Sequence, residues 1–180
     1  MTGIHVALIR GINVGRAKRV AMSDLRALVA GLGFTGVRTV LNSGNVIFTV
    51  TGKPRTGAAG LIEEGLAGKL GVSARVIVLS AGEFLTIVDE NPLLGTAGEA
   101  ARLLVAFFSS AADRTRLREL MQQDWTPETL AIGSRAAYLW CPEGILDSPV
   151  LESVGRALGG EMTTRNWATV MRLRALLDGP

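Results

Sequence analysis

The chain has few of the side chains on which catalysis and metal binding usually depend. Its 180 residues include one cysteine, Cys141, and one histidine, His5. A single cysteine excludes an internal disulfide and a cysteine-based metal cage. A single histidine excludes a multi-histidine metal site, and His5 stands in an apolar run, where a core role is expected rather than a classical triad. We therefore expect no metal and no cofactor.

Long apolar runs are also missing. No stretch approaches the roughly 18 uncharged apolar residues that a membrane span needs. Arg10 interrupts the apolar run at the N-terminus, so the order of a signal peptide is absent. With 48% hydrophobic residues the chain can bury a core, as one domain or as two small ones. We expect a cytoplasmic protein with no membrane partner.

The net charge of +3 is small, but it is unevenly distributed. Residues 1–23 contain no acid and four bases, namely Arg10, Arg16, Lys18 and Arg19. A second acid-free run, residues 163–177, contains Arg165, Arg172 and Arg174. If the fold brings these two runs together, they form one positive patch.

Hydrophobic periodicity predicts that the first half alternates strands and helices. The apolar run at 4–9 is typical of a buried strand, and the leucines and valine at 25–32 have helical spacing. Ser23 is a possible cap for that helix, and Gly33 supplies its end. The remaining elements are predicted as strands at 37–41 and 46–50, a helix at 58–70 and a strand at 76–79.

The second half repeats this plan without repeating the sequence. A strand at 103–108 is followed by a helix around 117–121, a hairpin at 129–140, a helix at 150–158 and a short strand at 161–163. The fold class is therefore predicted as α+β, with two ferredoxin-like halves of β-α-β-β-α-β order (the alpha-beta plait) and an extra C-terminal helix at 166–177. The predicted domains are residues 1–80, a linker helix and loop at 81–101, and residues 102–180.

The strands are apolar on both faces, whereas a sheet with one wet face should alternate with polar residues. Ile4, Val6 and Leu8 point one way and Ala7 and Ile9 the other. Something must cover the second faces, and we expect the two halves to pack together.

The basic loop after the first strand occupies the position of a phosphate-binding loop. Its glycines, Gly11 and Gly15, lack the third glycine of a dinucleotide fingerprint, and no Gly-Lys-Ser/Thr ending follows. A Rossmann or P-loop assignment is therefore rejected. Two readings stay open, a solvated loop or an anion-facing loop that uses Arg10, Asn13, Arg16, Lys18 and Arg19.

The turn at Ser43-Gly44-Asn45 joins two predicted strands. Glycine and asparagine tolerate positive φ, so a purely structural turn is one reading. In a ferredoxin-like sheet Asn45 would start a strand beside the one that ends at Arg10. The other reading therefore places Arg10, Asn13, Ser43 and Asn45 on one polar rim.

The segment Thr163-Thr164-Arg165-Asn166-Trp167 reads first as the entry to the last helix, with a threonine as cap. Its functional reading uses the positive helix end with Thr164, Arg165 and Asn166 to hold a phosphate or carboxylate. Elsewhere, Cys141 is expected to be an inert thiol. Glu143 and Asp147 are either solvated loop acids or a carboxylate pair.

Several of these motifs together resemble the bacterial domain-of-unknown-function family 1697. They are the loop at 10–19 with Met22, the segment Leu41 to Val46, the Pro142-Glu143-Gly144 turn, and Thr164-Arg165-Asn166-Trp167 with Thr169 and Arg172-Leu173. The resemblance implies two ferredoxin-like parts and no established activity. The chain departs from the family pattern at Pro149 and Arg172, where lysines are usual, so a mechanism that needs an amine at 149 is in doubt.

The leading hypothesis is a binding module for an anionic ligand, either a small molecule, a nucleotide or nucleic acid. Nucleic acid has weaker support, because the chain has only three tryptophans, one tyrosine and five phenylalanines to build a stacking platform. One alternative is a small-molecule enzyme with its site between the halves. Another gives the motifs a purely structural role in a monomer or homodimer.

Overall fold

The computed structural model describes residues 3–15, 19–52, 57–95 and 98–178. The chain divides into two compact units, Met1–Phe84 and Leu85–Pro180, and each is described by itself. In the described residues the fold is mixed α+β, with two four-stranded antiparallel sheets and six α-helices. None of the helices in this part of the chain is both long enough and apolar enough to cross a membrane.

The first unit alternates strands and helices as the periodicity predicts. Its elements are β1 (Gly3–Ile9), α1 (Met22–Gly31), β2 (Thr35–Val40), β3 (Asn45–Val50), α2 (Ala58–Leu70), β4 (Val76–Ser80) and the start of α3 (Ala81–Asp89). The strands are ordered β2-β3-β1-β4, so β1 is central and pairs antiparallel with β3 and β4. The loop after β1 therefore emerges in the middle of one sheet edge.

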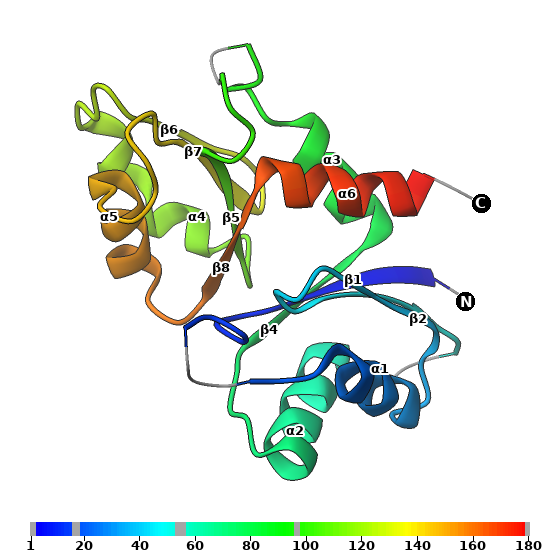
Figure 1. The fold of residues 1–180 in the computed structure, drawn as a ribbon. Helices are drawn as coiled ribbons and strands as arrows, with labels where there is room; N and C mark the ends of the chain where they lie inside the picture. Colours follow the sequence, from blue (N-terminus) through cyan, green and yellow to red (C-terminus); the bar gives the residue numbers. More distant parts are fainter. Residues whose placement is uncertain (1–2, 16–18, 53–56, 96–97, 179–180) are drawn as a thin grey trace. The chain divides into compact units, whose positions relative to one another are not determined.

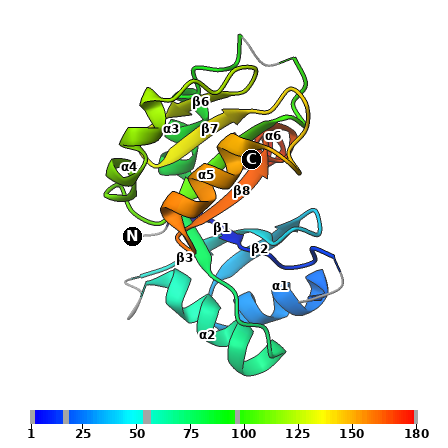
Figure 2. The ribbon, with the colours of Figure 1, turned by 90° about the vertical axis from the view of Figure 1, so that its left-hand side faces the viewer.

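Helices α1 and α2 cover one face of this sheet. Figures 1 and 2 show the two helices side by side beneath the strands. Ala7 and Ile9 of β1 and Phe48 of β3 point to these helices and are fully buried with Leu25 of α1 and Leu66 of α2. The alternation along β1 therefore assigns one of its two apolar faces to the core of the unit.

The turn between β2 and β3 lies against the end of β1. The carbonyl of Gly44 accepts a hydrogen bond of 2.8 Å from the amide of Ile9. Gly44 has a φ of +75°, and a Cβ added to it would lie 2.9 Å from Cδ1 and Cγ1 of Ile12 and 3.0 Å from Cβ of Ile9. Glycine is needed here both for the backbone conformation and for the space.

The second unit follows the same order, with a shorter first helix. Its elements after α3 are β5 (Leu103–Phe108), α4 (Asp113–Arg116), a 3-10 helix (Arg118–Gln122), β6 (Thr129–Ile132), β7 (Ala136–Trp140), α5 (Pro149–Leu158), β8 (Met162–Asn166) and α6 (Trp167–Asp178). The strand order is β6-β7-β5-β8, which matches the first sheet with β5 at the centre. In both units a helix follows the last strand directly, α3 after β4 and α6 after β8.

The second sheet carries helices on both faces. Leu104, Ala106 and Phe108 of β5 form one core with the buried residues of α5, while α6 lies on the other side of the sheet (Figure 1). The hydroxyl of Tyr138 in β7 donates a hydrogen bond of 2.6 Å to the carbonyl of Ile87 in α3. The unbroken apolar character of β5 follows from this double cover.

The structure corrects three local predictions. The strand β8 runs from Met162 to Asn166, so Thr163, Thr164 and Arg165 are strand residues and not a helix entry. Pairing with β5 decides this, because the register sets Arg165 opposite Val105 in the ladder. The helix predicted at 117–121 is a short α-turn followed by a 3-10 helix. Ser23 lies inside α1, whose N-cap is Ala21.

Replacing Gly44 by alanine should lower the free energy of unfolding by about 2–4 kcal/mol, because the methyl group adds a clash to an unfavourable φ. Urea unfolding followed by far-UV circular dichroism measures this. Gly71→Ala is the matched control, since Gly71 has a φ of +64° but no heavy atom within 4 Å of an added Cβ. Its cost should stay near 1 kcal/mol. Equal losses in the two variants would show that the contact with Ile12 is unimportant.

Candidate functional site

The loop after β1 is closed by the side chain of Asn13. Its Nδ2 donates to the carbonyls of Val20 at 2.9 Å and of Asn42 at 2.8 Å. Its Oδ1 accepts from the amide of Val20 at 2.8 Å. Asn13 also adopts a positive φ of 57°, which asparagine tolerates better than most residues. One amide therefore ties the two ends of the loop together and fixes them to the β2–β3 turn.

Asn45, predicted to lie on a polar rim, is completely buried. Its Nδ2 donates to the carbonyl of Val40 and to Oγ of Ser43, both at 2.9 Å. The amide of Asn45 therefore holds the hairpin together and offers nothing to a ligand at the surface. Ser43 is half-buried and is one of its partners.

A pocket of about 510 Å³ lies where α1 begins. It is lined by Asn13, Arg19, Val20, Ala21, Met22 and Asn42. The N-cap residue, Ala21, has the extended conformation usual at this position but no side chain that can accept from the first-turn amides. The helix dipole and these amide groups give this end of α1 partial positive charge, and the exposed Arg19 adds a full charge beside it. Asp24 in the first turn offsets part of this charge, although it does not line the pocket. None of the described residues that line the pocket is acidic.

Arg16 and Lys18 belong to the same basic loop in sequence, but they lie outside the described residues. Their predicted part in anion binding stays a prediction.

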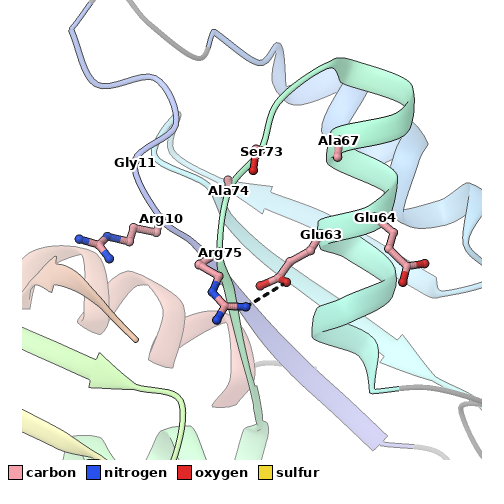
Figure 3. Close-up of a pocket in the computed structure, with 8 residues that line it drawn as sticks. All are labelled: Arg10, Gly11, Glu63, Glu64, Ala67, Ser73, Ala74 and Arg75. Atoms are coloured by element: carbon pink, nitrogen blue, oxygen red, sulfur yellow. Dashed lines mark ion pairs between the residues drawn. The ribbon is translucent and has the colours of Figure 1, made fainter. Parts of the chain in front are cut away.

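Arg10 lines a different pocket, of about 700 Å³, between the end of β1, the segment before β4 and α2. In Figure 3 the side chain of Arg75 reaches toward Glu63, whereas the guanidinium of Arg10 points away from that carboxylate. Arg75 and Glu63 form an ion pair of 3.6 Å, and Glu63 also accepts from the amide of Val76 at 2.8 Å. With Glu64 as a further lining residue, the pocket holds charges of both signs and is a poorer anion site than the one at α1.

Arg165 lies in β8 of the second unit, and its side chain is buried. Its guanidinium donates to Oγ1 of Thr163 at 2.9 Å and to the carbonyl of Thr164 at 2.7 Å. Burial lowers the pKa of Arg165 to about 10, so it keeps its charge at neutral pH. An anion-binding group needs access to solvent, and this guanidinium is buried, so the predicted role of Arg165 in holding a ligand stays a prediction.

The first turn of α6 is already capped. Oδ1 of Asn166 accepts a hydrogen bond of 3.0 Å from the amide of Thr169, so asparagine and not threonine is the cap. The anion site predicted at this helix end therefore has a competitor within the chain, and Thr164 lies in β8 before the helix starts. The start of α1 has no such side-chain cap, so the two helix starts differ in whether their first-turn amides already have an acceptor from a side chain.

The structure thus groups only some of the predicted residues. Asn13 and Arg19 line one pocket in the first unit, and Arg10 lines another. That the two basic runs share one site, and that an enzyme site lies between the halves, both stay predictions. Sequence reasoning missed Ala21 and Asn42, although a residue with no capping side chain just before a helix is a readable signal.

Cys141 and His5, the single cysteine and the single histidine, both have contacts within the fold. The buried thiol of Cys141 lies 3.4 Å from Oγ of Ser148, and burial raises its pKa, which makes it a weak nucleophile. Nδ1 of His5 lies 3.0 Å from the carbonyl of Gly3, and its ring stacks on Phe48. Within the described residues no group of three or more His, Cys, Asp or Glu side chains is placed to hold a metal ion.

These features define a small α+β protein of two similarly ordered units, whose first unit has a positively charged pocket at a helix start. The chain belongs to the family described as protein of unknown function (DUF1697), whose model matches residues 2–138. No curated protein matches the chain. It is similar to a solved structure, the conserved bacterial protein SP0830 from Streptococcus pneumoniae, with 21% identity, a TM-score of 0.75 and coverage of 99% of this chain and 100% of that one. This likeness shows the fold alone.

Asn13→Gly should lower the free energy of unfolding by about 2 kcal/mol, because three hydrogen bonds are lost while the positive φ is still allowed. Asn13→Ala should cost about 1 kcal/mol more, since alanine disfavours that backbone conformation. Urea unfolding of both variants provides the measurement. Asn42→Ala is the control, because the loop uses only the backbone carbonyl of Asn42, and a change within about 0.5 kcal/mol is expected. A loss in Asn42→Ala as large as that in Asn13→Gly would contradict the assigned role.

Proposed function

We propose that this protein binds an anionic ligand, carrying phosphate or carboxylate, in the pocket at the start of α1. The observation that carries the proposal is the combination of an uncapped helix N-terminus with Arg19 in a pocket that no described acidic side chain lines. The amides of the first turn need acceptors, and an anion supplies them while it meets the helix dipole and the guanidinium. The neighbouring bases in sequence, Arg16 and Lys18, strengthen attraction over longer distances.

The loop geometry supports a preformed site. Asn13 fixes both ends of the loop, and Gly44 holds the turn that contributes Asn42 against β1. A pocket whose walls are set by internal hydrogen bonds loses little conformational freedom when a ligand enters. The described part of the pocket is therefore already ordered before a ligand binds.

We also infer that both units are ferredoxin-like and derive from one plan. The support is the shared order β-α-β-β-α-β followed by a helix, with the same strand order in each sheet. One free cysteine, which is buried, is in keeping with a reducing cytoplasmic location.

A second candidate role for the motif at 163–166 is purely architectural. Arg165 is buried and donates to the carbonyl of Thr164, and Asn166 caps α6. In this reading the motif secures the second unit, and ligand binding belongs to the first unit alone.

Arg19→Gln should weaken binding of pyrophosphate by about 5–10-fold, because a charge-assisted hydrogen bond to the anion is lost. Isothermal titration calorimetry at low salt measures this, with citrate as a carboxylate probe and a short single-stranded oligonucleotide as a nucleic-acid probe. Arg38→Gln removes the same charge from an exposed position in β2 and is the control. Equal weakening in both variants would leave only non-specific charge attraction.

Ala21→Asp should raise the free energy of unfolding by about 1 kcal/mol and yet abolish most pyrophosphate binding. The new carboxylate accepts from the first-turn amides, so it stabilises α1 while it competes with the ligand. Ala21→Ser should stabilise the helix similarly but weaken binding less, because it carries no charge. Thermal unfolding and calorimetry on the same samples test whether stability rises while pyrophosphate affinity falls. A stabilised Ala21→Asp protein with wild-type affinity would show that pyrophosphate does not bind in this pocket.

A further inference from the structure

The second unit contains a groove of about 700 Å³ that the proposed function does not use. Two loops form it, residues 124–128 between the 3-10 helix and β6, and residues 143–147 between β7 and α5, together with Pro149 at the start of α5. Its residues all belong to the second unit, so the groove can be considered apart from the anion pocket of the first.

One side of the groove is apolar and open to solvent. Leu146 is 94% exposed and the adjacent Ile145 is 38% exposed. Trp125, Pro127 and Pro149 continue the apolar lining. Isolated exposed leucines are ordinary, but neighbouring apolar side chains that line a groove are typical of docking surfaces.

The rest of the lining is acidic. Four carboxylates line the groove, those of Asp124, Glu128, Glu143 and Asp147, and none of the described lining residues is basic. The hydroxyl of Thr126 donates to Asp124 at 2.7 Å and its amide at 2.9 Å, which lowers the pKa of this carboxyl. The groove therefore presents negative charge beside apolar surface at neutral pH.

Internal hydrogen bonds hold its walls in place. Nε1 of Trp125 donates to the carbonyl of Leu120 at 2.8 Å, which fixes the indole ring. Oε2 of Glu128 accepts from the amide of Val150 at 2.9 Å, at the start of α5. Because these side chains are already ordered, a partner pays little to dock against them. Glu143, Asp147 and Leu146 are exposed and available for contact.

We propose that this groove docks a segment of a partner protein in which lysine or arginine alternates with apolar residues. The apolar side chains of the segment cover Ile145 and Leu146, and its cations face Glu143 and Asp147. A cation over the ring of Trp125 adds a further favourable contact. Charge complementarity selects such a segment over neutral or acidic ones and speeds its association.

The test is a titration of the full ¹⁵N-labelled chain with an acetylated, amidated hexapeptide of alternating leucine and lysine. Two matched hexapeptides replace lysine by glutamate or leucine by serine. Only the leucine-lysine peptide should give saturable amide shifts, centred on 124–128 and 143–149, and its affinity should fall as salt rises.

Variants separate the two parts of the surface. Leu146→Ser should weaken the leucine-lysine peptide about tenfold, through the apolar burial it loses. Glu143→Gln combined with Asp147→Asn should weaken it about as much at low salt. Asp24→Asn, which removes an exposed charge from the first unit, is the control and should leave the affinity unchanged. The three substituted groove residues, Leu146, Glu143 and Asp147, are exposed. The variants should therefore lose peptide affinity without a change in the midpoint of thermal unfolding.

Four outcomes would overturn the proposal. Absence of shifts in the two loops would show that the groove does not dock this chemistry. Equal binding of the serine-lysine peptide would show that charge alone accounts for peptide binding. Equal binding of hexylamine would show that the groove binds small amines and does not require a peptide. Concentration-dependent self-association that Leu146→Ser abolishes would identify a second copy of the chain as the occupant.

Discussion

The close approach of the β2–β3 turn to the end of β1 is the constraint on which the candidate site depends. Gly44 brings the turn within van der Waals contact of Ile9 and Ile12, and its carbonyl is bonded to the amide of Ile9. With the turn in this place, the carbonyl of Asn42 is within reach of Asn13. The central strand, the turn and the basic loop are therefore fixed relative to one another before any ligand is considered.

The same electrostatic rule has opposite consequences at two helix starts. Both α1 and α6 expose amide groups at their first turns, as every helix does. At α6 the chain supplies its own acceptor through Asn166, whereas at α1 the residue before the helix is an alanine. The position of one short polar side chain decides which helix end stays open to an outside anion. This local difference, more than the total of basic residues, supports the ligand site that we propose in the first unit.

Most of the secondary structure could be predicted from the sequence, because apolar periodicity is strong in elements such as 4–9, 58–70 and 103–108. The predicted strand ends too early, at residue 163, because the threonine and arginine that follow have the composition of a loop. Their strand conformation comes from pairing with β5, a contact far away in sequence that local preference does not encode.

The candidate site was predictable in part. The sequence assigns Asn13 and Arg19 to one basic loop, and both line the pocket at α1, while their part in binding an anion stays a prediction. For Asn45 the sequence leaves a structural turn and a polar rim open, because burial of an amide depends on tertiary packing, and the complete burial of its side chain favours the structural reading. The groove at 124–149 is not predictable as a unit, because its two loops meet only in the folded protein, although a carboxylate pair of Glu143 and Asp147 is one reading of the sequence.

The position of Arg165 in β8 affects the register in which this strand pairs with β5. Arg165 lies in β8, one of the two edge strands of the second sheet in the order β6-β7-β5-β8. In the observed ladder Arg165 opposes Val105, and its face is not the one that Leu104, Ala106 and Phe108 contribute to the core beneath α5. Sliding β8 by a single residue would turn the guanidinium into that core. Facing the apolar core would place this charge where the side chains of Leu104, Ala106 and Phe108 offer no hydrogen-bond acceptor, and this cost favours the observed register.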